Sequence, residues 1–420
     1  MISSRANTAT VPELELVLAS DPDVIKQVWI NNKVHFAPYA SDEAWLEKSR
    51  IRTNVDLGPG MGHSIWVLVP RGKGNDPTSI LSAAHIILRP GLISKITSKA
   101  TSELPTNKEL NAQELKHSNT QHILASQQNG HLTESTHELK EIAVAYVLLV
   151  FTPIEHRSRG FANAMLRMVM DKLKHQTDPV VDLSYLFSAI EPTFYANLGW
   201  QMMRSRELVL DQLKSHVFPD LPLVDASAAG AKYRINNVTE SDLREIVNED
   251  VELLRSEMAK CTLEAPRGQN LHFVTILPHE EAFRTHFEMT RYSNLHIDHI
   301  NRPITRIGVR LVSIDEHYKG LDAFVIWTYI PSSSRICILR LRYQTVHQLQ
   351  CLLREAMKEA QEWGFSMVSV WDLNDKDALA ATGMFNRDRT SWWLCVAQME
   401  HENFGGSITM VANGAYTWGL

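Results

Sequence analysis

The stretch that decides the fold is residues 147–166, which read VLLVFTPIEHRSRGFANAML. An apolar run ends at Thr152-Pro153, a basic turn containing one glycine follows, and an amphipathic helix begins near Gly160. A buried strand that turns through basic and small residues into a helix N-terminus presents unpaired backbone N–H groups and the positive end of the helix dipole to an anion. The segment therefore predicts a pyrophosphate site, and with it a nucleotide-type cofactor.

The composition is that of an ordinary globular protein of more than one domain. The chain has 420 residues, of which 44% are hydrophobic and 21% charged, and this length favours two or three domains. A net charge of −6 without a long basic run argues against a nucleic-acid or membrane-surface binder. The N-terminus lacks the apolar core of a signal peptide, and the longest apolar run, 142–151, is too short to span a bilayer. We therefore expect a soluble, cytoplasmic protein.

The four cysteines indicate neither a disulfide framework nor a zinc site. Cys261, Cys337, Cys351 and Cys395 form no CxxC pair, and no histidine stands at metal-ligand spacing from them. Free thiols in a reducing compartment are the simple interpretation. We expect no metal.

The first half of the chain predicts a mixed α/β domain. Apolar periodicity and cap residues predict strands at 13–19, 64–69, 80–88, 142–151, 183–188 and 200–210, and helices after Pro22 and at 41–52, 160–175 and 192–198. Residues 98–140 are polar, contain no Phe, Trp or Tyr, and bury too little apolar surface to fold on their own. We expect a disordered insertion there. The first domain is predicted to cover residues 1–215.

The second half predicts a similar order of elements. A turn-rich linker at 216–235 is followed by a domain over 236–420, with helices at 240–258, 346–364 and 375–382 and strands at 306–314, 323–330, 335–342 and 367–371. The two halves are therefore predicted to share one topology. The corresponding strand-to-helix turn here, 342–346, has no glycine and little basic charge, so we expect a single cofactor site, in the first half.

Two motifs of the first half resemble a known superfamily. Arg157-x-x-Gly160-x-Ala162, between a strand and a helix, resembles the acyl-CoA pyrophosphate loop of the GNAT acetyltransferases. The sequence FYANLGW at 194–200 resembles the short helix that carries an aromatic acid in that superfamily. Their order and separation make the pair more specific than either alone. The resemblance implies an α/β (α+β) fold, with a GNAT acyl-CoA N-acyltransferase domain in the first half and a degenerate GNAT-like domain in the second.

A narrower resemblance is to the fungal lysine N-acetyltransferases. It rests on VFTP at 150–153 with the basic loop after it, on LSYLFS at 183–188, and on the large second domain. Ser158 stands where a glycine or another small residue is usual, and Ala189 and Glu191 replace an expected acidic residue and glycine. The resemblance implies acetyl-CoA as co-substrate and free L-lysine, acetylated at N6 in lysine catabolism, as acceptor.

The same resemblance assigns the site residues. Tyr195 would protonate the leaving thiolate. The residues that would bind acetyl-CoA are Val150, Phe151, Arg157, Ser158, Arg159, Gly160, Phe161 and Ala162. His85, on a strand beside the expected substrate groove, is a candidate base, although a lone histidine on an apolar strand is more often a core residue.

Three functions are compatible with these residues. The first is N-acetylation of a small amine, most simply lysine. The second is acetylation of a protein N-terminus or lysine side chain. The third is a degenerate acyltransferase fold that binds CoA as a sensor without catalysis. The acceptor and the oligomeric state are not specified by the sequence.

Overall fold

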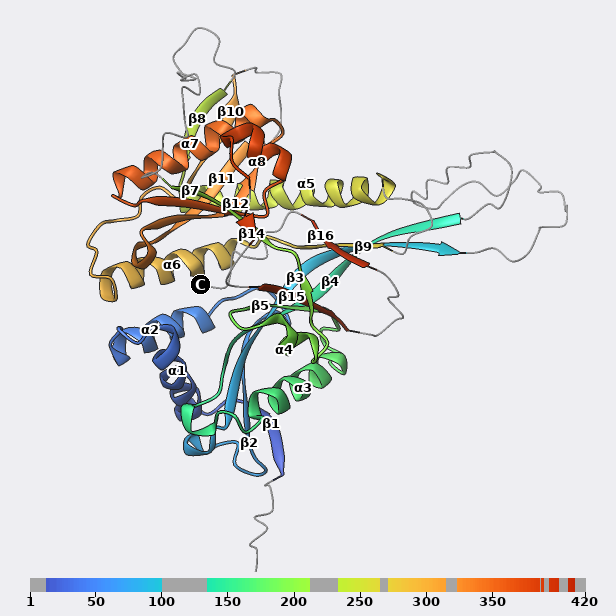
Figure 1. Cartoon of the computed structure of the whole chain (residues 1–420), viewed down its shortest axis with the longest axis vertical. Coiled ribbons are helices and arrows are strands. Elements are labelled where there is room, and N and C mark those ends of the chain that lie inside the picture. Colours follow the sequence, from blue (N-terminus) through green and yellow to red (C-terminus); the bar gives the residue numbers. More distant parts are fainter. Residues whose placement is uncertain are drawn as a thin grey trace, which may run out of the picture.

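The computed structural model describes residues 13–99, 134–211, 233–264, 271–314, 323–385, 387–388, 393–399 and 407–411. Two mixed β-sheets, each covered by helices, make up the molecule (Figure 1). The α/β class is therefore confirmed. The expected insertion lies mostly outside the described residues, as do the expected linker and the last nine residues of the chain.

The first sheet has the strand order β1-β2-β3-β4-β5-β15-β6. Its strands are β1 (Leu14–Leu18), β2 (Gly62–Pro70), β3 (Ser82–Lys99), β4 (Glu134–Phe151), β5 (Val181–Ser188), β15 (Trp393–Gln398) and β6 (Gln201–Met203). Two further strands, β9 (Leu271–Ile276) and β16 (Ser407–Met410), continue it: β9 pairs with β3, and β16 with β9. The long β3–β4 hairpin thereby gains two strands from the second half.

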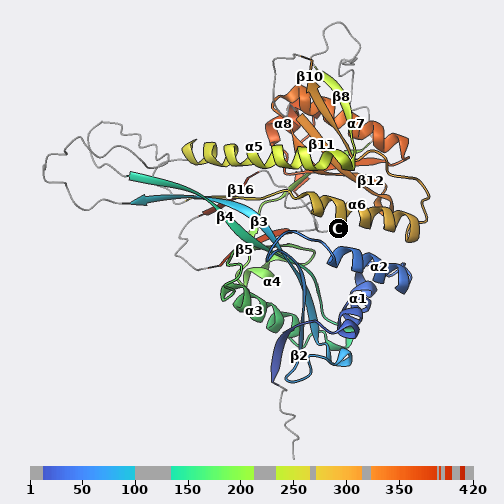
Figure 2. The same ribbon diagram turned by 180° about the vertical axis from the view of Figure 1, so that it is seen from behind.

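Helices cover both faces of the first sheet. The helices α1 (Pro22–Phe36) and α2 (Asp42–Thr53) lie on one face, and α3 (Phe161–Lys174) and α4 (Pro192–Ala196) on the other (Figures 1 and 2). Asp21 caps α1 through the N–H groups of Asp23 and Val24, and Ser41 caps α2 through that of Ala44. These caps explain why both helices begin where the sequence predicts.

The second sheet repeats the order of the first. Its strands, in spatial order, are β14 (Arg387–Asp388), β7 (Arg206–Asp211), β13 (Met367–Trp371), β12 (Arg335–Arg342), β11 (Ala323–Ile330), β10 (Gly308–Ser313) and β8 (Tyr233–Val238). Its helices are α5 (Leu243–Glu264), α6 (Glu280–His296), α7 (Val346–Glu362) and α8 (Asp375–Thr382). The two halves therefore share the spatial order of their strands as well as the expected order of elements along the chain.

The two halves exchange one strand each. The sequence predicts a single strand at 200–210, and this is wrong: the chain breaks at Arg204-Ser205, so that β6 stays in the first sheet while β7 pairs with β13 in the second. The side chain of Asp372 accepts hydrogen bonds from Arg206 N (2.7 Å) and Ser205 Oγ (3.1 Å) at the crossing point. In return, β15 fills the place between β5 and β6. Each sheet therefore contains strands from both sides of the predicted linker at 216–235. The predicted domain bounds, 1–215 and 236–420, stay a prediction.

One core joins the halves. Buried side chains from the first sheet, such as Tyr146 and Tyr185, pack in the same cluster as Phe283 and Phe287 of α6 and Phe324 of β11. Burial of apolar surface of this kind stabilises by roughly 25 cal/mol per Å². Side chains of the second half therefore cover part of one face of the first sheet.

The structured hairpin is longer than the sequence predicts. The expected strands end at residue 88 and begin at residue 142, whereas β3 and β4 remain paired out to Lys99 and Glu134. Pairing of β9 against residues 91–96 of β3 supports this extension, and that long-range partner is invisible to local composition. Among the helices of the described part, none is long and apolar enough to cross a membrane.

We predict that a charge buried in β15 unfolds the first sheet. Val396 is 2% exposed and pairs with Tyr185 of β5 and Gln201 of β6. Val396→Asp should lower the free energy of unfolding by about 3–5 kcal/mol because the buried carboxylate has no counter-charge. Urea unfolding followed by circular dichroism measures it. Gln398→Asp, at the partly exposed end of the same strand, is the control, and equal stabilities of the two variants would contradict the prediction.

Candidate active site

The two central strands of the first sheet separate part-way along their length. The parallel pair β4–β5 is joined only from Ala143 and Val181 to Tyr146 and Tyr185. Beyond this point β4 continues to pair with β3, and β5 with β15. The backbone of residues 147–151 is therefore unpaired on the side that faces β5, and its polar groups are available to a ligand.

A β-bulge at the end of β4 accounts for the separation. Between the pairs His85–Leu148 and Ala83–Phe151, β4 carries one residue more than β3. Leu149, in this interval, has a φ of 48°, in the left-handed region that costs an L-residue roughly 1–2 kcal/mol. Because a bulge bends its strand and increases the local twist, it directs the end of β4 away from β5.

The turn after β4 ends in an uncapped helix. Ser158 has a φ of 59° and Gly160 a φ of 82°, so the loop passes twice through the left-handed region. Gly160 is the N-cap of α3 and provides no side-chain hydrogen bond to its first turn. The first N–H groups of α3 thus remain available for an anion, with the helix dipole behind them. A pyrophosphate is the kind of anion that such a helix N-terminus accommodates.

The conformation of Ser158 explains a departure from the family pattern. A positive φ is the conformation for which glycine is favoured, and this is the position where the resemblance leads one to expect glycine or another small residue. Ser158 thus adopts the left-handed backbone conformation that a glycine would adopt at this position, at a cost in backbone strain.

The two arginines of the turn lie at the surface beside aromatic rings. The guanidinium of Arg157 lies 5.3 Å from the ring centre of Phe151, and its Nε donates to Thr152 O at 3.1 Å. The guanidinium of Arg159 lies 5.0 Å from the ring centre of Phe161. Both side chains remain exposed and supply positive charge at the mouth of the turn. Ala162 is partly buried in the first turn of α3.

Tyr195 lies on the face of the sheet that carries α3. It is 7% exposed and belongs to the cluster that contains Phe161 and Met165, against which Val150 packs. Its hydroxyl has no hydrogen-bond partner in the part of the chain that the structure describes. Burial, with a contribution from the nearby Cys395 thiol, raises the pKa of Tyr195 to about 12. The phenol therefore keeps its proton at neutral pH, as a proton donor must.

Cys395 belongs to the strand exchanged from the second half. It is fully buried on β15, and burial raises the pKa of its thiol to about 11. It is therefore a neutral packing partner of Tyr195, supplied by residues 393–398.

His85 is enclosed in the sheet and satisfied by its neighbours. It is 0% exposed; its Nδ1 lies 3.0 Å from Nε2 of His63, and its Nε2 lies 3.2 Å from Nδ2 of Asn32. Burial holds the pKa of His85 well below its usual value. With both ring nitrogens engaged, His85 has none left for the proton of an acceptor amine, and this geometry supports the core alternative over the base.

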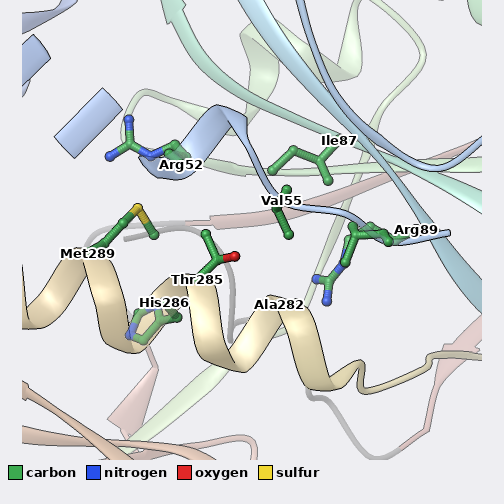
Figure 3. Close-up of a pocket in the computed structure, with 9 residues that line it drawn as sticks. Arg52, Val55, Ile87, Arg89, Ala282, Thr285, His286 and Met289 are labelled. Atoms are coloured by element: carbon green, nitrogen blue, oxygen red, sulfur yellow. The ribbon is translucent and has the colours of Figure 1, made fainter. Parts of the chain in front are cut away.

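A pocket lies on the opposite face of the sheet, between the two halves (Figure 3). It is partly open to solvent, and its space of about 340 Å³ includes part of that open solvent. Its walls are the end of α2 with the loop after it, β3 and α6, through Arg52, Val55, Leu57, Ile87, Arg89, Ala282, Thr285, His286 and Met289. Ile87 is paired with Tyr146 in the sheet, so the pocket adjoins the point where β4 and β5 begin to separate.

The sequence alone does not indicate this pocket. Arg89 ends an apolar strand sequence, and a charged residue there was the one available signal. The contribution of α6 depends on how the halves pack, which local patterns do not specify.

Two family models match the chain. One, described as an acetyltransferase (GNAT) domain, matches residues 121–203. The other, described as the LYC1 GNAT-like C-terminal domain, matches residues 222–419. Both halves of the chain therefore match GNAT models. The expected superfamily and the two-part GNAT architecture are confirmed, and the chain is an N-acetyltransferase with acetyl-CoA as its co-substrate.

Solved structures are similar to the chain at low sequence identity, and one of them reaches a TM-score above 0.5. A conserved protein of unknown function from Enterococcus faecalis V583 is 12% identical, with a TM-score of 0.51 over 93% of this chain and 74% of that one. A GCN5-related N-acetyltransferase from Kribbella flavida is 11% identical, with a TM-score of 0.48 over 92% and 71%. A tandem GNAT protein from the clavulanic acid biosynthesis pathway is 13% identical, with a TM-score of 0.46 over 93% and 100%. No curated protein matches the chain.

We predict that a negative charge at Gly160 blocks CoA binding. A Cβ at this position would meet nothing within 4 Å, so a substitution there acts through the positive φ and through charge. Gly160→Asp should weaken CoA binding at least tenfold, about 1.4 kcal/mol, because the carboxylate repels the pyrophosphate. Gly160→Ala isolates the backbone strain and should change affinity less. Calorimetric titration with CoA measures both, and equal affinities for Gly160→Asp and the parent would contradict the prediction.

Proposed function

We propose that this enzyme acetylates the amine of a small metabolite, and that free L-lysine, modified at N6, is the acceptor. The observation that carries the proposal is the pocket between the halves, which adjoins the opening between β4 and β5. An amine that enters from this pocket meets an acyl group held in the opening from the other face. A pocket closed by α6 suits a free metabolite better than a folded protein surface.

The choice of lysine is supported by sequence. Residues 150–160 and 183–195 resemble the corresponding loops of fungal lysine N-acetyltransferases, and the second half matches the LYC1 GNAT-like model. We propose on the same grounds a cytoplasmic enzyme of lysine catabolism.

Acetyl transfer needs a neutral amine, stabilisation of the oxyanion and protonation of the leaving thiolate. The amine must be neutral when it attacks the thioester carbon, and its proton then passes to solvent or a base. Backbone N–H groups near Val150 and Phe151, on the unpaired edge of β4, stabilise the oxyanion that forms. The tetrahedral intermediate then collapses: the bond from the acetyl carbon to sulfur breaks, and the bond to nitrogen remains. Tyr195 donates its proton to the departing thiolate sulfur.

The direct test is acetyl transfer to a panel of amines. Purified protein is incubated with acetyl-CoA and L-lysine, other amino acids, polyamines or a lysine-containing peptide, and released CoA thiol is measured. We expect turnover with lysine, and N6-acetyl-lysine as the product by mass spectrometry. Turnover of the peptide alone would contradict the proposal, and so would an absence of turnover with every small amine.

We predict that Tyr195→Phe slows turnover while retaining cofactor binding. Loss of a general acid costs roughly 10²–10⁴-fold in rate, so kcat should fall by at least 10²-fold with the CoA dissociation constant little changed. Because the pKa of Tyr195 is raised to about 12, wild-type activity should not decline through deprotonation of Tyr195 below about pH 11. Tyr39→Phe, at a 65% exposed tyrosine, is the matched control. An unchanged kcat in Tyr195→Phe would exclude the acid role.

A further inference from the structure

The pocket between the halves contains two buried guanidinium groups. Arg52 is 7% exposed and Arg89 1% exposed, and both line the pocket from the first half (Figure 3). Arginine is almost never this deeply buried unless it is paired. Their surroundings therefore require an explanation.

The second half shows how this protein normally treats buried arginines. Arg340 and Arg342, which are 7% and 8% exposed, both donate to the carboxylate of Asp250, at distances of 2.6–3.0 Å. That carboxylate is itself buried, and the two guanidinium groups hold its pKa below the usual value. The charges there are compensated within the protein.

Among the described residues, Arg52 has no such carboxylate partner. Its Nη1 is buried without a hydrogen bond within the described residues, and its guanidinium lies 5.6 Å from the ring centre of Trp45. None of the nine residues that line the pocket is acidic. Burial lowers the pKa of Arg52 to about 10, so the group is still charged at neutral pH. An uncompensated buried charge of this kind is costly.

The opposite wall of the pocket also presents unsatisfied polar atoms. His286 of α6 is 3% exposed, and neither of its ring nitrogens has a partner in the described part of the chain. Burial together with the charges of Lys48 and Arg52 lowers the pKa of His286 to about 3, so its ring is neutral. At the other end of the pocket, Arg89 donates to the hydroxyl of Tyr185 at 3.3 Å. The pocket is thus positively charged, with unsatisfied groups on both walls.

We propose that this pocket binds the carboxylate of the acceptor, with Arg52 as its principal partner, so that the enzyme acts on carboxylate-bearing amines. This inference rests on the proposed function, which supplies the small amine. A carboxylate accepts two parallel hydrogen bonds from a guanidinium and neutralises its charge. The pocket then selects free amino acids and rejects both simple diamines and lysine side chains within proteins, which have no carboxylate of their own.

The phosphates of CoA do not explain the pocket. The uncapped N-terminus of α3, which suits the pyrophosphate, belongs to the α3–α4 face of the sheet, whereas Arg52 belongs to α2 on the other face. The two positive regions therefore serve two different anions.

Turnover of matched substrates tests the inference. Cadaverine is lysine without its carboxylate, so the ratio of kcat/KM for lysine to that for cadaverine isolates the contribution of this group. A hydrogen-bonded charge pair should favour lysine by at least tenfold, on the order of a hundredfold. Equal use of the two amines by the wild-type enzyme would overturn the inference and leave the proposed small-amine acetylation intact.

Variants of Arg52 locate the selectivity. Arg52→Gln should raise KM for lysine at least tenfold with kcat less affected, and should lower kcat/KM for lysine far more than for cadaverine, so that the preference disappears. Arg52→Lys should restore part of it. Arg50→Gln, on the same helix at a side chain that is 54% exposed and paired with Glu47, is the matched control. An equal loss for both substrates in Arg52→Gln would indicate a merely structural role and overturn the inference.

A binding measurement separates this inference from catalysis. L-Norleucine carries the carboxylate but no side-chain amine, and pentylamine is the same molecule without the carboxylate. In the presence of CoA, calorimetry should detect norleucine but not pentylamine binding to the wild type, and should detect neither with Arg52→Gln. Norleucine binding without any lysine turnover would refute the proposed function alone. Absence of norleucine binding to the wild type would refute the carboxylate site.

Discussion

One extra residue in β4 is the constraint on which the site depends. The bulge around Leu149 ends the pairing of β4 with β5 after Tyr146 and Tyr185, and the sheet opens where a continuous ladder would have closed it. The parts of the proposed site are arranged around this opening: the uncapped helix α3 and Tyr195 lie on one face, and the pocket lies on the other. The packing of a sheet that is buried on both faces compensates the backbone strain at Leu149. The bulge thereby leaves polar backbone groups unpaired within an apolar core.

The second half contributes structure to the candidate active site, although its own strand-to-helix turn at residues 342–346 has no glycine and little basic charge. It supplies β15 beside Tyr195, through Cys395, and α6 as the far wall of the pocket. The second half thus contributes through its strands and helices, which complete the first sheet and the pocket. The reciprocal departure of β7 into the second sheet makes the dependence mutual.

Local elements were predictable where local physics decides them. Caps and apolar periodicity locate α1, α2, α3 and α7 closely, and the turn at residues 157–160 is recognisable from its glycine and basic residues alone. The sequence does not indicate the exchange of β7 and β15, because a strand's pattern specifies which face is apolar and not which sheet receives it. For the same reason Arg52 was missed, since it becomes significant only when α6 of the other half is placed against it. For His85 the strand position left a base and a core residue both open, and its contacts with His63 and Asn32 favour the core residue.

The exchanged strand also constrains how the chain is made. The edge of β5 that receives β15 is synthesised about 200 residues before its partner, which at ribosomal rates of about 5–20 residues per second means an interval of roughly 10–40 s. Throughout this time the nascent first half carries an unpaired, apolar strand edge next to the central strand of its sheet, the kind of edge that pairs with other chains. The first domain therefore completes its fold only after translation of nearly the whole chain, and its yield in a cell depends on how well that edge is protected until then.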